Sequence, residues 1–230
     1  MKYNPMSPPN WQQIDTVLLD MDGTLLDLHF DNYFWQFYVP QCYAKLQGIS
    51  EAEALTELNK SFISLRGTLN WYCLDFWSEL TGLPILKLKQ EVAHKIAIRP
   101  QVLEFLTELR RLNKRTVIVT NAHRDSVNLK IARTGLDKYV DRIISSHDYQ
   151  QPKETAEFWQ ALQQDEPFNK ARTLFIDDSQ AVLASAANWG VEWLVSINNP
   201  DSQMPAQISE NFFGIDEFEQ ILCSRVVEIS

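Results

Sequence analysis

The chain has 230 residues, of which 45% are hydrophobic and 22% are charged, and its formal net charge at pH 7 is −9. This composition is typical of a globular protein with one good core and room for a smaller second unit, and it excludes a disordered or fibrous chain. The acidic balance argues against a surface that binds DNA or RNA, and equally against one that binds an anionic membrane.

The N-terminal stretch and the cysteines indicate a cellular compartment. The first ten residues contain Pro5, Pro8 and Pro9 and lack the apolar run of a signal peptide. No later stretch has the length and hydrophobicity of a membrane span. The three cysteines are far apart in sequence and form no metal-type pair, which is typical of a reducing environment. We therefore expect a cytoplasmic protein.

The first predicted element is a strand over Val17–Asp20, followed by Met21, Asp22 and Gly23. Because side chains alternate along a strand, the two carboxylates point to the same side. Paired carboxylates at the end of an apolar strand suit a hard cation such as Mg²⁺, since isolated buried charge is costly. The alternative is a strand that ends in an ordinary Asp-Gly hairpin turn.

The interval from Leu28 to about Ile98 shows helical periodicity and no clear strand. Pro40, Gly48, Gly67 and Gly82 divide it into short helices. An insertion of this length is too long for a simple crossover connection, and it predicts a small helical bundle.

From Thr116 onward, apolar strands alternate with helical segments. This alternation predicts a doubly wound parallel α/β sheet, with helices that end at Gly135 and Gly190. The predicted strands are Thr116–Thr120, Arg142–Ser146, Thr173–Asp177 and Trp193–Ile197, and the predicted helices are Gln101–Asn113, Asp125–Thr134, Lys153–Gln164, Gln180–Trp189 and a short closing helix over Asp216–Cys223.

Polar residues lie at the ends of three predicted strands and in one predicted loop. Thr120 and Asn121 end the second strand, Asp177 and Asp178 end the fourth, and Lys153 precedes a helix. The carboxyl ends of parallel strands meet at one edge, where open α/β sheets bind ligands. Each piece also has a plain structural interpretation: a solvated surface lysine, a turn, or a helix cap.

This series of an Asp-x-Asp, a Thr, a Lys and an acidic pair resembles the haloacid dehalogenase (HAD) superfamily. The resemblance implies a HAD-like Rossmannoid core, residues 1–27 and 99–230, with an inserted α-helical cap of the C1 type, residues 28–98. It also implies that Asp20 is the nucleophile and that Asp22 is the general acid and base, which favours phosphate-ester chemistry.

Further roles are implied for the other motif residues. Mg²⁺ would be held by Asp20, the backbone carbonyl of Asp22, and Asp177, with Asp178 in support. Thr120 and Asn121 would hold phosphate oxygens, and Lys153 would neutralise the nucleophile and the transferring group.

From about Trp11 to Ser202 the chain also resembles the bacterial GMP/IMP nucleotidases of this superfamily. The segments that carry this likeness include Phe30-Asp31-Asn32-Tyr33-Phe34-Trp35 and Thr68-Leu69-Asn70-Trp71-Tyr72-Cys73-Leu74-Asp75. The resemblance implies a purine nucleoside 5′-monophosphate as substrate. One departure from the wider superfamily is Gln151-Pro152-Lys153-Glu154, where a glycine and a Lys-Pro are commoner.

Substrate recognition would fall to the cap, whose aromatic rings and amides could stack on a base or read its edge. Most of these aromatic residues could instead form the core of the cap itself. The candidates for specificity are Asn32, Arg66, Asn70, Trp71 and His123.

Three alternatives stay open at this point. The enzyme could be a phosphatase of sugar phosphates or other small phosphomonoesters, or a phosphomutase. A different class is a non-catalytic module that binds phosphate. The sequence predicts no oligomeric state.

Overall fold

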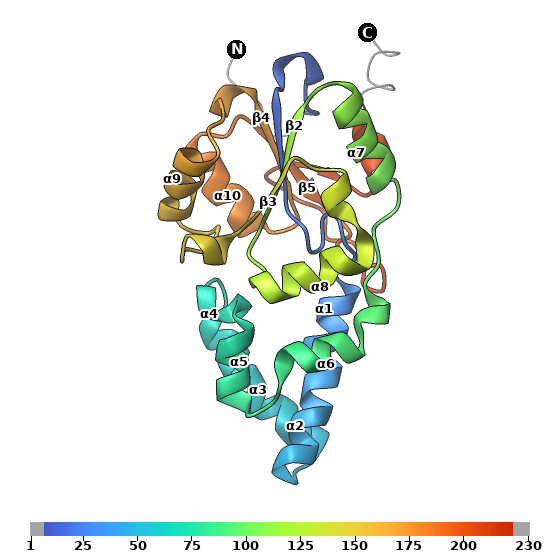
Figure 1. The fold of residues 1–230 in the computed structure, drawn as a ribbon, viewed down its shortest axis with the longest axis vertical. Coiled ribbons are helices and arrows are strands. Elements are labelled where there is room, and N and C mark those ends of the chain that lie inside the picture. Colours follow the sequence, from blue (N-terminus) through green and yellow to red (C-terminus); the bar gives the residue numbers. More distant parts are fainter. Residues whose placement is uncertain (1–6, 223–230) are drawn as a thin grey trace.

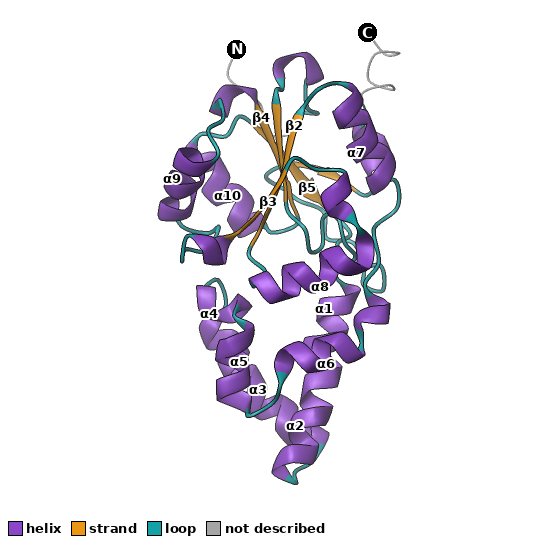
Figure 2. Cartoon of the chain, viewed as in Figure 1, coloured by secondary structure: helices purple, strands orange, loops and turns teal. Residues whose placement is uncertain are grey.

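A six-stranded parallel sheet forms the centre of the protein in a computed structural model that describes residues 7–222 (Figures 1 and 2). The strand order is β3-β2-β1-β4-β5-β6. The strands are β1 (Thr16–Leu19), β2 (Arg115–Thr120), β3 (Arg142–Ser145), β4 (Thr173–Asp177), β5 (Trp193–Ile197) and β6 (Phe213–Ile215).

This sheet confirms the predicted fold class and the five predicted strands to within a residue or two. The prediction missed β6, a three-residue strand that pairs with β5. Such a short Phe-Gly-Ile segment after a polar loop carries no recognisable period. The closing helix is shorter than predicted: it is a 3-10 turn over Phe218–Ile221, and Cys223 lies outside the described residues.

Strand β1 lies between β2 and β4 and is parallel to both. Leu19 is paired with Ile118 of β2 and with Ile176 of β4. The residues that follow these three positions therefore emerge at one edge of the sheet. This register is what brings the polar strand ends together.

Helices cover both faces of the sheet (Figure 1). On one face, Val17 and Leu19 pack in the same apolar cluster as Phe105 of α7 (Val102–Arg111) and Val127 of α8 (Arg124–Thr134). On the other face, Leu18 packs with residues of α9 (Ala156–Asp165) and α10 (Gln180–Trp189). The alternation of side chains along β1 thus divides the core into two layers.

Helix α9 begins at Ala156, three residues later than predicted. Thr155 caps it, because its hydroxyl accepts a hydrogen bond from the Phe158 N–H at 3.4 Å. Lys153 therefore lies in the preceding loop. The predicted helix ends at Gly135 and Gly190 are confirmed, since both glycines have left-handed backbones with φ of 68° and 97°.

Residues 28–98, here called the helical insertion, contain helices and no strand in the structure. The helices are α1 (His29–Tyr33), α2 (Val39–Gln47), α3 (Glu51–Leu65), α4 (Leu69–Tyr72), α5 (Leu74–Thr81) and α6 (Ile85–Glu91), with a π-helical turn over Phe34–Tyr38 and a 3-10 turn over Ala93–Lys95. They gather beyond the strand ends in Figure 1. The two connections to the sheet lie side by side, with a bridge between Leu26 and Ile98.

Pro40 does not divide the insertion as predicted. The backbone stays helical from α1 through the π-turn into α2, with Pro40 in the first turn of α2. Proline lacks the N–H that an α-helix needs, and the π-turn just before it changes the local hydrogen-bond pattern. Gly48 and Gly82 end α2 and α5 in left-handed conformations, as their positions predicted.

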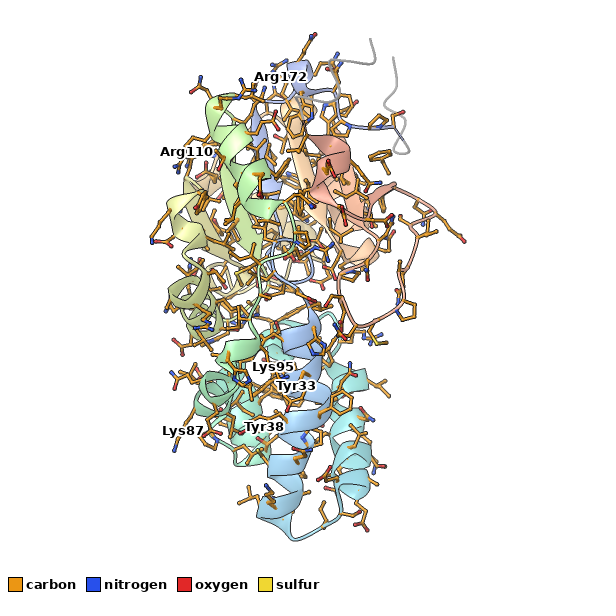
Figure 3. All side chains as sticks on the ribbon, turned by 90° about the vertical axis from the view of Figure 1, so that its right-hand side faces the viewer. Tyr33, Tyr38, Lys87, Lys95, Arg110 and Arg172 are labelled. Atoms are coloured by element: carbon orange, nitrogen blue, oxygen red, sulfur yellow. The ribbon has the colours of Figure 1, made fainter. Side chains whose placement is uncertain are left out.

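The insertion has an aromatic core of its own. The ring centroid of Trp77 lies 5.4 Å from that of Trp35 and 5.0 Å from that of Phe62. On its outer side, the ammonium group of Lys95 lies 4.1 Å from the centre of the Tyr33 ring, and both are labelled in Figure 3. None of the described helices is long and apolar enough to cross a membrane.

Candidate active site

The loop after β1 turns sharply at Gly23, whose φ is 87°. A Cβ atom at this position would lie 2.7 Å from a carboxylate oxygen of Asp178, so a larger residue here would displace that side chain as well as strain the backbone. The hairpin interpretation fails, because the two strands beside β1 are both parallel to it. The turn instead leaves Asp20 buried at the strand end and Asp22 just beyond it.

Lys153 reaches into this edge from its loop and is 2% exposed. Its ammonium group donates hydrogen bonds to Asp20 at 2.5 Å and to Asp177 at 2.7 Å. It also donates to the Val119 carbonyl at 3.1 Å. Burial opposes the charge, but the two carboxylates outweigh it and raise the pKa of Lys153. The interpretation of Lys153 as a solvated surface lysine is therefore wrong.

The two acids at the end of β4, Asp177 and Asp178, differ in burial and in hydrogen-bond partners. Asp177 is buried, binds Lys153, and accepts a hydrogen bond from the Ser179 N–H at 2.8 Å. Asp178 is half-buried. The carboxylate of this pair that accepts a hydrogen bond from Lys153 is therefore that of Asp177.

Asp20, Asp177 and Asp178 have carboxylate oxygens that all lie within 4.8 Å of one another. Burial raises the pKa of Asp20 to about 6, and it also raises the pKa values of Asp177 and Asp178. Lys153 alone does not balance three carboxylates. A set of hard oxygen donors with surplus negative charge fits a cation such as Mg²⁺.

Thr120 and Asn121 lie at the end of β2 and are both buried. The Thr120 hydroxyl accepts a hydrogen bond from the Ala122 N–H at 3.1 Å, which holds the turn. The Asn121 side chain accepts from the Lys153 N–H at 2.9 Å and so positions the lysine loop.

Asn121 also links the sheet to the helical insertion. Its amide nitrogen donates to Glu154 at 3.0 Å, and the hydroxyl of Tyr72 donates to the other oxygen of that carboxylate at 2.9 Å. Burial and the neighbouring Glu154 raise the pKa of Tyr72, which keeps the phenol protonated. Neither Tyr72 nor Glu154 was a predicted site residue, because each meets its partner only in the folded chain.

A second ion-pair network lies beside the first, and the sequence analysis missed it. Lys130 of α8 is 1% exposed and lies 2.7 Å from Asp22 and 2.7 Å from Asp31 of α1. Lys89 of α6 lies 2.5 Å from the other oxygen of Asp31. One signal could have revealed Lys130: it follows Val127 by three positions, so it falls on the buried face of its helix.

Charges within this network change its pKa values. Burial raises the pKa of Asp22 to about 6, although the nearby Lys130 opposes the rise. Burial acts the same way on Asp31, but Lys130 and Lys89 outweigh it and lower the pKa of that carboxyl. Burial lowers the pKa of Lys89, whereas Asp22 and Asp31 raise that of Lys130 despite its burial.

A cavity of about 630 Å³ opens between the strand ends and the helical insertion. Its floor holds the catalytic candidates Asp20, Asp22, Thr120, Asn121, Lys153, Asp177 and Asp178. Among the specificity candidates, Asn32, Arg66, Trp71 and His123 line the cavity, whereas Asn70 is exposed and lies outside the lining. Asn32 donates a hydrogen bond to Asp201 at 2.7 Å.

Comparison with known proteins agrees with this geometry. Residues 14–190 match the family model of the haloacid dehalogenase-like hydrolases. The chain is 39% identical over 214 residues to a GMP/IMP nucleotidase, YrfG, of Escherichia coli strain K12, which covers 93% of this chain and 96% of that protein. This match confirms the predicted resemblance.

Solved structures share the fold. A HAD phosphatase from Thermococcus onnurineus superposes with a TM-score of 0.74 at 22% identity, covering 93% of this chain and 98% of that one. A putative HAD-hydrolase from Bacillus subtilis, bound to magnesium, gives a TM-score of 0.64 at 18% identity and covers 90% and 96%. The chain therefore belongs to the haloacid dehalogenase-like hydrolase family and is an enzyme of the hydrolase class.

Proposed function

We propose that this hydrolase is a Mg²⁺-dependent phosphatase that hydrolyses purine nucleoside 5′-monophosphates. The observation that carries the proposal is the position of Asp20. Its buried carboxylate is held by Lys153, lies beside Asp177 and Asp178, and opens onto a cavity large enough for a small phosphomonoester.

In the first half of the reaction, a carboxylate oxygen of Asp20 attacks the phosphorus, and the bond from phosphorus to the ester oxygen breaks. Asp22 donates its proton to the departing alkoxide. Lys153 neutralises charge on the nucleophile and on the transferring group. The products of this half are the free alcohol and a phosphorylated Asp20.

In the second half, water attacks the phosphorus of the phosphorylated Asp20, and Asp22 takes a proton from that water. Inorganic phosphate leaves, and Asp20 returns to its starting state. Thr120 and the backbone N–H of Asn121, at the end of β2, would hold phosphate oxygens.

Asp20, Asp177 and the backbone carbonyl of Asp22 would hold the metal, with Asp178 in support. When bound, Mg²⁺ would supply positive charge that attracts the phosphate group and stabilises the charge developing during transfer. The composition of the cavity lining supports such a cation, because it contains five aspartates against three lysines and one arginine.

The purine substrate is supported by the nucleotidase relative and by the lining of the cavity. Trp71, Trp35 and Phe62 offer aromatic surface in this lining. Asn32 and Arg66 add polar groups to it. A sugar phosphatase, a phosphomutase and a phosphate-binding module are the competing proposals.

A panel of phosphomonoesters tests the proposal directly. With Mg²⁺ present, the protein should release phosphate from GMP and IMP faster than from hexose phosphates. Asp20→Asn should abolish release, whereas Asp137→Asn, at an exposed position away from the cavity, should leave it unchanged. Preference for hexose phosphates contradicts the substrate, and isomerisation without release indicates a mutase. Full activity of Asp20→Asn contradicts the mechanism.

A further inference from the structure

Three side chains with nitrogen or sulfur donors meet at the boundary between the helical insertion and the sheet. Cys73 lies between α4 and α5, His123 precedes α8, and His147 lies in the 3-10 turn Ser146–Asp148 after β3. The ligand atoms of all three lie within 4.8 Å of one another, and all three residues are half-buried. They are separate from the carboxylate set of Asp20, Asp177 and Asp178.

His147 is prepared to act as a ligand. Its Nε2 atom is buried and has no hydrogen-bond partner among the described residues. The ring also forms a hydrogen bond with the Asn121 backbone, and since Nε2 has no partner, this bond belongs to Nδ1. A proton on Nδ1 leaves the Nε2 lone pair free. Burial lowers the pKa of His147 to about 4, so the ring is neutral at physiological pH.

His123 has carboxylates on both sides of its ring. Its Nδ1 atom lies 3.8 Å from Asp125, and its Nε2 atom lies 3.7 Å from Asp75. A carboxylate next to one ring nitrogen is the usual outer partner of a histidine that binds metal through the other nitrogen. In this structure Nδ1 accepts a hydrogen bond from the Asp125 N–H at 3.3 Å, so the proton of the neutral ring is on Nε2. Metal binding through Nε2 therefore requires that proton to move to Nδ1.

We propose that Cys73, His123 and His147 form a binding site for a borderline-soft divalent cation of the zinc class, with Asp75 able to supply a fourth ligand. One thiolate and two imidazoles suit Zn²⁺ and do not suit Mg²⁺, which requires oxygen donors. A tetrahedral zinc ion places its ligand atoms about 3.5 Å apart. The present separations, all within 4.8 Å, are compatible with that spacing.

The site joins two parts of the chain. Cys73 and Asp75 belong to the helical insertion, whereas His123 and His147 belong to loops at the strand ends. A bound ion therefore ties the insertion to the sheet on the side where His123 lines the cavity. Movement of the insertion relative to the sheet becomes harder while the ion is bound.

Cobalt binding tests the site without any reference to phosphatase activity. In a Cys42→Ser, Cys223→Ser background, Cys73 is the sole thiol of the chain. Adding one equivalent of Co²⁺ to this protein, after treatment with a chelator, should produce thiolate-to-cobalt charge-transfer absorption in the near ultraviolet. Zn²⁺ should bleach the band. Asp20→Asn should keep it, because the carboxylate set is a different site.

Substitutions of the ligands complete the test. In the wild-type background, Cys73→Ser and His147→Ala should each weaken Zn²⁺ binding by roughly tenfold or more. The matched controls Cys42→Ser and His94→Ala should bind Zn²⁺ like the wild type, because neither residue belongs to the cluster. Absence of the charge-transfer band, loss of the band in Asp20→Asn, or equal Zn²⁺ affinity in Cys73→Ser and wild type would each overturn the proposal.

Discussion

The ammonium group of Lys130 lies 2.7 Å from a carboxylate oxygen of Asp22, and the same group lies 2.7 Å from Asp31 of the helical insertion. The proposed general acid and base, Asp22, is thus paired with a lysine that also forms an ion pair with the insertion. Because the lysine is buried, its charge acts on Asp22 through a medium that screens poorly. The position of the insertion and the chemistry of Asp22 are physically linked through this one group.

Lys130→Met should lower kcat for phosphomonoester hydrolysis on the order of 100-fold, because Asp22 loses the cation that positions it. The free energy of unfolding should also fall, by about 3–5 kcal/mol, since Asp22 and Asp31 remain buried without their shared partner. Steady-state kinetics and urea unfolding measure the two effects separately.

The double variant Lys130→Met, Asp31→Asn separates positioning from folding. Asp31 keeps its ion pair with Lys89 at 2.5 Å in the single variant, so Asp31→Asn should lower the stability further by leaving Lys89 buried without its partner. The kcat should fall no further than in Lys130→Met, because Asp22 has already lost its cation. If the folded single variant keeps kcat within about twofold of wild type, Lys130 does not position the acid.

Lys89 and Lys87 lie two positions apart on α6 and provide a matched pair. Lys89 is buried, pairs with Asp31 at 2.5 Å, and lies 4.9 Å from the ring centres of Phe30 and Phe34. Lys87 is exposed and points away from the molecule in Figure 3. Lys89→Met should therefore cost several kcal/mol of unfolding free energy, and Lys87→Met less than about 0.5 kcal/mol. Equal melting temperatures for the two variants would show that the buried pair contributes nothing net.

The edge of the sheet could be predicted because hydrophobic runs and their polar ends are local signals. Val17–Asp20 and Thr173–Asp177 are short apolar runs that end in a carboxylate, so each segment indicates where its strand ends and which acid lies there. The parallel alternation then implied that Asp20, Thr120 and Asp177 share one edge, and the pairing register agrees.

Contacts between side chains that are far apart in the sequence could not be predicted. Asp31 and Lys130 are 99 positions apart, and Tyr72 and Glu154 are 82 apart, so neither contact leaves a local pattern. Cys73 and His147 are also far apart in the sequence, and their separation matches no recognised metal-binding motif. Pro40 misled the prediction, because a π-turn accommodates the proline that would break an ordinary helix.

Without metal, Asp20 should destabilise the folded protein as the pH rises. Burial raises its pKa to about 6, whereas an ordinary aspartate in the unfolded chain titrates near 3.8. Between these values the folded state binds more protons than the unfolded state, so the unfolding free energy falls with increasing pH and the cost is complete above about pH 7.

Asp20→Asn should therefore stabilise the metal-free protein by on the order of 1–3 kcal/mol at about pH 8, and by much less at about pH 4. Urea unfolding in the presence of a chelator measures this difference. Asp137→Asn serves as the exposed control and should show no such dependence. A variant that is equally destabilised at both pH values would indicate that the Lys153 hydrogen bond outweighs the burial of charge.

Tyr72→Phe should weaken the contact between the helical insertion and the lysine loop. The substitution removes the hydroxyl that donates to Glu154 at 2.9 Å, and Glu154 is then held only from the other side, by Asn121 at 3.0 Å. Removing one hydrogen bond to a charged group costs about 1.5–3 kcal/mol. The substitution therefore weakens the contact that holds the insertion against the loop of Lys153 beside the cavity. We expect KM to rise about tenfold with a smaller change in kcat, because the groups around Asp20 stay in place. Tyr43→Phe is the control, since Tyr43 bonds Glu57 within the insertion and away from the cavity. A fall in kcat with KM unchanged would instead place Tyr72 in the chemical step.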